Sequence, residues 1–199
     1  MQCILSSIGL SCTSVYNYVK THVQKNASAV IITTAHREKE KNKWAIKAAE
    51  QLKEIDFKEI TFVDLDQQTE GNLPNADLIY ICGGNTFYLL NSIHRHIGID
   101  RFKQYIKNCQ IYIGVSAGAA ILGKDIQILE NIKMDLNEVN LQQTQGLNFL
   151  SKEIIPHSDI FPMDPKILED TDTFLCIPNN EGYLLNIENS TFKKITNEN

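Results

Sequence analysis

The residues with the clearest chemical potential are 114–118, which read Gly-Val-Ser-Ala-Gly. They follow the apolar run 111–113, Ile-Tyr-Ile, and precede small and apolar residues that favour a helix. A Gly-x-Ser-x-Gly sequence between a strand and a helix is typical of a nucleophile elbow, a tight turn that lifts the serine off the end of a sheet. The pattern predicts a reactive hydroxyl on Ser116. The alternative is a glycine-rich turn in which Ser116 only caps the following helix.

A serine hydroxyl becomes a nucleophile when a nearby base takes its proton. His157 follows a strand-like run and a proline, which places it at the end of a strand, where a catalytic group is expected. His36 precedes a predicted helix and is the rival base. His22, His94 and His96 fall on predicted helices and are expected at the surface.

Acyl transfer also needs hydrogen-bond donors for the negative oxygen that develops on the substrate carbonyl. The elbow offers the backbone N–H of Ala117, and a second donor could come from Gly83 or Gly84, because glycine lets the backbone approach a ligand closely. The alternative for residues 83–85 is a plain turn or a phosphate-binding nest. Their spacing matches neither a P-loop nor a dinucleotide fingerprint.

The base usually needs a third group that fixes its tautomer. Five carboxylates lie between Ser116 and His157, and spacing alone does not choose among Asp125, Glu130, Asp135, Glu138 and Glu153. Asp159 lies too close to His157 in sequence to orient it easily. No cluster of His, Cys, Asp and Glu has metal-ligand spacing, so no metal or other cofactor is expected.

These residues must be positioned by alternating strands and helices. Apolar runs predict strands at 2–6, 29–33, 59–65, 78–82, 111–115, 152–156, 173–177 and 183–187. Helical patterns cover 14–24, 38–55, 87–94 and 101–107, and the clearest, 38–55, has an apolar face of Trp44, Ala45, Ala48, Ala49, Leu52 and Ile55. The alternation predicts an α/β fold, a three-layer sandwich around a mostly parallel sheet. Ligands bind such sheets beyond the carboxyl ends of the strands, so residues 82–85 and 114–118 should lie together there.

Length and composition limit the class of protein. The 199 residues fit one domain, 1–199, and 43% hydrophobic with 22% charged residues is ordinary for a soluble globular protein. A net charge of -5 without a basic cluster argues against nucleic acid or an anionic membrane as partner. No apolar run approaches the ~20 residues that cross a bilayer, and residues 1–10 hold no Lys or Arg, so no signal peptide is expected.

The cysteines and the strand edges bear on compartment and assembly. Five cysteines, an odd number with no Cys-x-x-Cys pair, predict reduced thiols in a cytoplasmic protein. Edge strands and the C-terminal segment could support a homodimer, a question that no residue pattern decides.

Three blocks of sequence resemble the signature of the peptidase E family of serine peptidases, which includes aspartyl dipeptidases and cyanophycinases. They are 81–90, Ile-Cys-Gly-Gly-Asn-Thr-Phe-Tyr-Leu-Leu; 114–119, Gly-Val-Ser-Ala-Gly-Ala; and Pro156-His157. The resemblance in order and spacing extends over nearly the whole chain. It implies a flavodoxin-like α/β sandwich similar to class I glutamine amidotransferase domains, with serine in place of their elbow cysteine.

The resemblance also implies roles for individual residues. Ser116 would be the nucleophile and His157 the base, with the amides of Gly84 and Ala117 forming the oxyanion hole and Asn85 and Thr86 binding substrate. The family's acid is expected after the serine and before the histidine. An ungapped count lands on Asn131, so the adjacent Glu130 is the first choice for the acid and Asp135 the second.

The resulting expectation is a serine peptidase that hydrolyses dipeptides or short peptides through a Ser-His-acid triad and an acyl-enzyme. Aspartyl dipeptidases are expected to hold the acidic side chain with a basic residue after the histidine. Residues 158–173 contain only Lys166 and no arginine, so strict Asp-X cleavage is not expected. Two alternatives stay open: an esterase of the α/β-hydrolase type, for which the chain is short and lacks a His-Gly-Gly-Gly motif, and a binding domain that kept the fold and lost turnover.

Overall fold

A seven-stranded sheet forms the centre of the computed structural model, which describes residues 1–24, 26–68 and 72–196. The strand order is β3-β2-β4-β5-β1-β8-β9. The strands are β1 (Gln2–Ser6), β2 (Ser28–Ile32), β3 (Glu59–Val63), β4 (Leu78–Ile81), β5 (Ile111–Val115), β8 (Gly182–Asn186) and β9 (Thr191–Lys194). The first five pair in parallel, and the β8–β9 hairpin joins β1 in antiparallel fashion. The predicted fold class is confirmed: the sheet is mostly parallel, and helices flank it.

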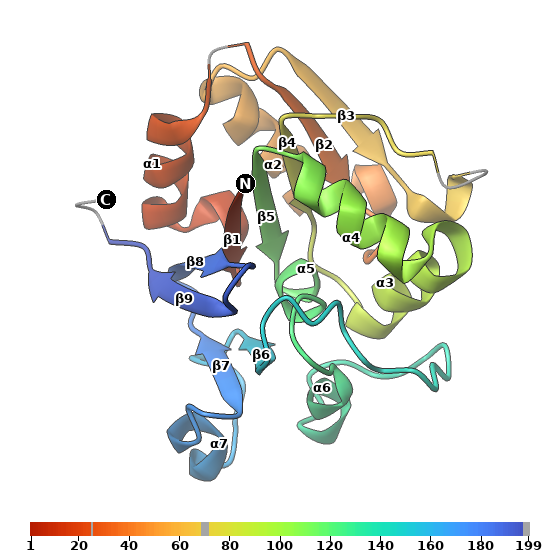
Figure 1. The fold of residues 1–199 in the computed structure, drawn as a ribbon, viewed down its shortest axis with the longest axis vertical. Helices are drawn as coiled ribbons and strands as arrows, with labels where there is room; N and C mark the ends of the chain where they lie inside the picture. Colours follow the sequence, from red (N-terminus) through yellow and green to blue (C-terminus); the bar gives the residue numbers. More distant parts are fainter. Residues whose placement is uncertain (25, 69–71, 197–199) are drawn as a thin grey trace.

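Helices cover both faces of this sheet (Figure 1). On one face α1 (Thr13–His22) and α2 (Lys43–Glu54) share a hydrophobic cluster with Ile4, Ile31 and Ile113. On the other face α3 (Thr86–Ser92), α4 (Ile99–Asn108) and the short α5 (Ala117–Ala120) pack with residues such as Leu5 and Tyr112. Helices on both faces explain why β4 and β5 are buried along their whole length and read as continuous apolar runs.

The predicted helix over 38–55 is divided in the structure. Its first part is the 3₁₀ turn η2 (Lys39–Lys41), and α2 begins at Lys43 because the Asn42 side chain accepts a hydrogen bond from the Trp44 amide at 2.8 Å. The buried face of α2 contains Ala45, Ala48, Ala49 and Leu52. Trp44, which the periodicity places on that face, is instead 57% exposed.

A second, two-stranded sheet pairs β6 (Glu153–Pro156) with β7 (Phe174–Ile177) in parallel. Both strands were expected from the sequence, but they pair with each other and not with the central sheet. The short helices α6 (Gln127–Asn131) and α7 (Pro165–Glu169), which were not expected, flank this region (Figure 1). The small sheet matters for the site because β6 leads directly into His157 and so positions this residue.

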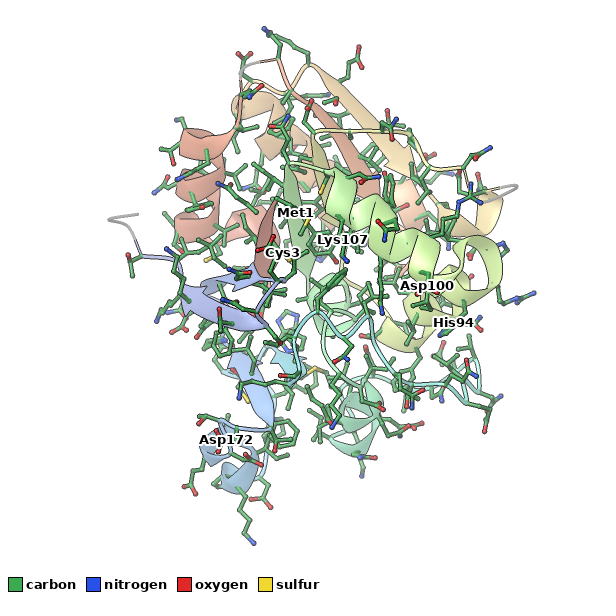
Figure 2. All side chains as sticks on the ribbon, viewed as in Figure 1. Met1, Cys3, His94, Asp100, Lys107 and Asp172 are labelled. Carbon is green, nitrogen blue, oxygen red and sulfur yellow. The ribbon has the colours of Figure 1, made fainter. Side chains whose placement is uncertain are left out.

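The carboxyl ends of β1 and β5 point toward α5, β6 and β7 in Figure 1. Figure 2 labels Met1, Cys3 and Lys107 near the amino ends of these strands, whereas Asp172 lies beside α7 at the bottom of the view. None of the helices within residues 1–24, 26–68 and 72–196 combines the length and apolar character needed to cross a membrane.

Candidate active site

Ser116 occupies the turn between β5 and α5 with φ 50° and ψ -107°, a conformation that non-glycine residues rarely adopt. Holding such a residue costs of order 1–3 kcal/mol, and such strain clusters at functional sites. The turn is closed by close backbone contacts: a methyl group on Gly118 would lie 2.6 Å from the carbonyl oxygen of Ile81. These contacts require glycine on both sides of the serine, as the elbow pattern predicted.

His157 faces the serine across the end of the sheet, with Nε2 3.0 Å from Ser116 Oγ. Its backbone is fixed by the buried Ser7, whose Oγ accepts a hydrogen bond from the His157 amide at 2.9 Å and donates one to the Ile177 carbonyl at 2.8 Å. His157 itself has φ 56°, so its position is imposed by these contacts. Ser7 stands just after β1, so its contact with His157 connects the central sheet to the histidine that follows β6.

The other ring nitrogen of His157, Nδ1, lies 2.7 Å from Oδ1 of Asn179. An amide oxygen only accepts, so Nδ1 carries the proton and Nε2 is left to accept the hydrogen of Ser116 Oγ. Asn179 follows β7, and its own backbone amide donates to Asp159 Oδ1 at 2.9 Å. The structure thus shows a Ser116–His157–Asn179 chain of hydrogen bonds, with Asp159 supporting the third member.

Glu130, the first choice for the acid, requires correction. It lies on α6, where Oε2 accepts a hydrogen bond from Gln127 Nε2 at 2.8 Å, and the ring partner of His157 is Asn179 instead. The reason is topological: the β6–β7 pair brings a residue from beyond His157 to the ring, whereas Glu130 was chosen by its distance along the chain from Ser116.

Asp135, the second choice for the acid, interacts electrostatically with His157, but its hydrogen bonds are with Thr86. Its Oδ2 accepts hydrogen bonds from the Thr86 amide and the Thr86 hydroxyl at 2.9 and 2.5 Å. Burial raises the pKa of this carboxyl, and the hydrogen bonds from Thr86 and the charge of His157 oppose the rise. Asp135 therefore fixes the start of α3 close enough to His157 for their charges to interact.

Asn85 and Thr86, the expected substrate-binding residues, also have partners within the protein. Asn85 caps α3 through Oδ1, which accepts from the Tyr88 amide at 2.8 Å, and its Nδ2 donates to the Leu136 carbonyl at 2.7 Å. Thr86 is 1% exposed. Both side chains therefore support the loop, and the substrate-binding role expected for them stays a prediction.

The glycine loop 83–84 lies directly beside the nucleophile. A methyl group on Gly83 would be 3.0 Å from Ser116 Cβ, and Gly84 has φ 149° with its α-carbon packed against the Ala35 and His36 backbone. Among the residues that the structure describes, none accepts a hydrogen bond from the amide of Gly84 or of Ala117. Two amides free to donate beside a serine are what an oxyanion hole requires.

A cavity of about 320 Å³ adjoins Ser116 and His157. Its walls come from the loop after β1, the glycine loop after β4 and the first turns of α2, so it lies on the α1/α2 face of the sheet. His36, the rival base, lines this cavity, and its Nδ1 accepts a hydrogen bond from the Glu38 amide. Trp44, exposed in spite of its predicted place on the buried face, lines it too.

Cys82 is a second potential nucleophile at the cavity. Burial raises the pKa of its thiol to about 12, so the thiol is neutral at physiological pH and is a poor nucleophile. All five cysteines lie within the described residues and are free. The same part of the chain contains no group of three or more His, Cys, Asp or Glu side chains placed to hold a metal ion.

Comparison with known proteins places this geometry in a family. The sequence profile of peptidase family S51 matches residues 5–195. The chain belongs to peptidase family S51. An uncharacterized peptidase of Pasteurella multocida is 30% identical over 140 residues, which are 67% of this chain and 67% of that protein. The peptidase E of Nostoc sp. is 26% identical over 159 residues, 70% of this chain and 61% of that protein.

The fold of the S51 chain is shared with solved structures. A crystal structure of a Listeria monocytogenes protein superposes with a TM-score of 0.79 and 22% identity over 98% of both chains. The profile and the peptidase E relatives confirm the family that the three sequence blocks indicated. Membership in S51 supports serine peptidase activity for this chain.

Sequence reasoning missed Asn179 and Ser7. Asn179 stands just after the strand-like run 173–177, at the kind of strand end that was used to select His157. That position could have indicated Asn179, but the usual third group of a triad is a carboxylate, and Asn179 is an amide. Ser7 stands just after the first strand, and its role depends on a contact with His157, 150 residues away in the chain, which no local pattern reveals.

Proposed function

We propose that this S51 chain hydrolyses dipeptides or short peptides, with Ser116 as the nucleophile that forms an acyl-enzyme. The observation that carries the proposal is the contact of 3.0 Å between Ser116 Oγ and His157 Nε2, made by a serine on a strained elbow. A turn that only capped a helix would need neither the strain nor a histidine at hydrogen-bond distance.

In the first step, His157 Nε2 takes the hydroxyl proton as Ser116 Oγ bonds to the substrate carbonyl carbon. The carbonyl oxygen becomes an oxyanion, and the amides of Gly84 and Ala117 are the donors placed to stabilise it. The C–N bond then breaks, His157 gives its proton to the leaving amine, and the acyl group stays on Ser116. Water repeats the sequence, with His157 as base, and releases the acid.

Asn179 differs from the usual third member because it carries no charge. It fixes the tautomer and orientation of His157 through Nδ1–H, but it gives no ionic stabilisation to the imidazolium that forms during acylation. The half-buried Asp135 is a carboxyl close enough to interact with His157, and this interaction opposes the rise that burial causes in the pKa of Asp135.

The cavity beside Ser116, at about 320 Å³, is at the small end of the range for ligand sites and has room for little more than one residue of a substrate, which supports short peptides. A mixture of dipeptides and tripeptides, incubated with the protein and analysed by mass spectrometry, tests the proposal. We expect amino acids to be released by the wild type and not by Ser116→Ala.

Two other outcomes would favour an esterase or a binding domain over a peptidase. Hydrolysis of p-nitrophenyl esters with no cleavage of any peptide would indicate an esterase. Binding of peptides without cleavage, by a folded protein that fails to react with a fluorophosphonate, would indicate a binding domain without turnover.

A further inference from the structure

No side chain that carries a permanent charge at neutral pH lines the cavity beside Ser116 in the described part of the chain. Its lining residues, all within the described part of the chain, include no Lys, Arg, Asp or Glu. The ionisable side chains that line it are His36 and His157, together with the neutral thiol of Cys82 and the buried phenol of Tyr80. This absence of fixed charge limits which side chain of a peptide the cavity can accept.

Most polar groups of the wall are already engaged in the fold. Ser7 bridges His157 and Ile177, and the Asn42 oxygen caps α2. Gln51 Nε2 donates to the Leu10 carbonyl at 2.9 Å. A carboxylate entering the cavity would therefore lose its hydration without gaining a lysine or arginine partner, and the free amides beside Ser116 are placed for the substrate's carbonyl oxygen, so its binding there is unfavourable.

Three cations close to the cavity residues in sequence, Arg37, Lys43 and Lys47, have other contacts. Arg37 Nη2 contacts both carboxylate oxygens of Glu138, at 3.0 and 2.7 Å. Lys43 and Lys47 place their ammonium groups 4.9 and 5.8 Å from the centre of the Trp44 ring. None of these three side chains lines the cavity.

The remaining wall is apolar, and so is part of the surrounding surface. Ile8, Tyr80 and Val115 line the cavity with the exposed Trp44. Leu136 and Ile160, each 62% exposed, belong to segments bonded to the site, through the Leu136 carbonyl to Asn85 and through the Ile160 amide to His157. The apolar wall residues, together with the exposed Trp44, indicate apolar contact with a ligand.

We propose that the cavity binds the side chain of the residue whose carbonyl is attacked, and that this side chain is uncharged and preferably apolar or aromatic. The inference rests on the proposed function. Ser116 itself, with Gly83 and Gly84, bounds the cavity, so its occupant adjoins the carbon that bonds to Oγ and remains on the acyl-enzyme. The substrate class is then short peptides with a residue such as leucine or phenylalanine on the acyl side, in contrast to peptides with an acidic residue there.

Aminoacyl-coumarin amides of Leu, Phe, Asn and Asp test this inference, with kcat/KM measured for each. Asn and Asp form a matched pair, nearly equal in shape and different in charge. We expect Leu and Phe to be the best substrates and Asn to exceed Asp by at least about 10²-fold. Equal or faster turnover of the Asp amide would overturn the inference, as would failure to cleave the Leu, Phe and Asn amides by enzyme that still reacts with a fluorophosphonate.

A variant pair links the preference to the cavity. Ser11 lines the wall, and Ser11→Arg should narrow the Asn-to-Asp ratio by about tenfold or more, whereas Ser11→Gln adds bulk without charge and should leave the ratio unchanged. An unchanged ratio in folded Ser11→Arg would contradict the assignment of this cavity. Failure of the proposed function is distinguishable, because the wild type would then form no fluorophosphonate adduct and cleave none of the four amides.

Discussion

His157 Nδ1 and Asn179 Oδ1 are 2.7 Å apart, so an uncharged amide fixes the imidazole that contacts Ser116. An amide oxygen reproduces the orienting effect of a carboxylate and omits its charge. The arrangement separates two contributions that usually come from a single residue, the tautomer of the base and the electrostatic stabilisation of its protonated form.

Asn179→Ala should lower kcat/KM by about 10²- to 10⁴-fold, because His157 loses the group that fixes its tautomer. Asn179→Asp should retain activity near that of the wild type and move the acid limb of the pH profile to higher pH, since the new carboxylate stabilises the imidazolium. The measurement is kcat/KM between pH 5 and pH 9 for both variants. Equal loss in the two variants, with intact folds, would show that Asn179 has only a structural role.

Glu130→Gln should leave kcat/KM within about twofold of the wild type, because its side chain contacts Gln127 on α6 and not His157. Steady-state kinetics on a cleaved dipeptide provide the test, with Asn179→Ala assayed in parallel as the variant that must lose activity. A large fall in kcat/KM of Glu130→Gln, with unchanged thermal stability, would indicate that this carboxylate takes part in catalysis.

Much of the site could be predicted because its parts are local in sequence. Residues 114–118 span the end of a buried strand and the turn after it, and their glycines are required by contacts within that turn, so the pattern alone predicts the strained turn at Ser116. The contact of His157 with Ser116 could be expected because a strand leads into His157 at the same edge of the fold. The mostly parallel sheet followed from the alternation of apolar runs and helical patterns.

The third group could not be predicted in the same way. Asn179 reaches His157 only because β7 pairs with β6, and the sequence gives no register between strands separated by 17 residues, 157–173. The exposure of Trp44 was also missed. Helical periodicity places it beside Ala45 and Ala48, and only the cap at Asn42 fixes where α2 begins and which way its first turn faces.

Alkylation by iodoacetamide at pH 7.5 should leave Cys82 unmodified and the activity unchanged. Burial raises the pKa of the Cys82 thiol to about 12, so the thiolate is fewer than about one molecule in 10⁴ at that pH. Peptide mapping of the native and the urea-unfolded protein makes the comparison, with Cys82 expected to react only after unfolding. Modification of Cys82 in the folded protein would contradict the assignment of a neutral, protected thiol.

Asp77 should stabilise the fold at neutral pH and lose that effect in acid. Its pKa is lowered by hydrogen bonds from the Ser28 amide and hydroxyl, at 2.8 and 2.9 Å. A carboxyl with a lowered pKa in the folded state stabilises above its unfolded value, near about 4, and the benefit disappears as the pH falls through the folded value. Asp77→Ala should reduce the free energy of unfolding by about 1 kcal/mol at pH 7, since solvent screens this half-buried carboxyl, and by less at pH 2.5.

Urea denaturation at the two pH values measures the difference for Asp77→Ala against the wild type. Asp172→Ala is the matched control, because Asp172 is exposed beside α7. A deficit in Asp77→Ala that is as large at pH 2.5 as at pH 7 would mean that the charge of Asp77 is not what stabilises the junction of β2 and β4.

The most direct measurement is the intact mass of the protein after reaction with a fluorophosphonate, for the wild type and for Ser116→Ala. A fluorophosphonate bonds to a serine oxygen that has a base and an oxyanion hole, which are the features inferred for Ser116. We predict one adduct per chain on the wild type, located at Ser116, and none on Ser116→Ala. A folded wild type that remains unmodified, or an adduct that persists in Ser116→Ala, would contradict the assignment of Ser116 as the nucleophile.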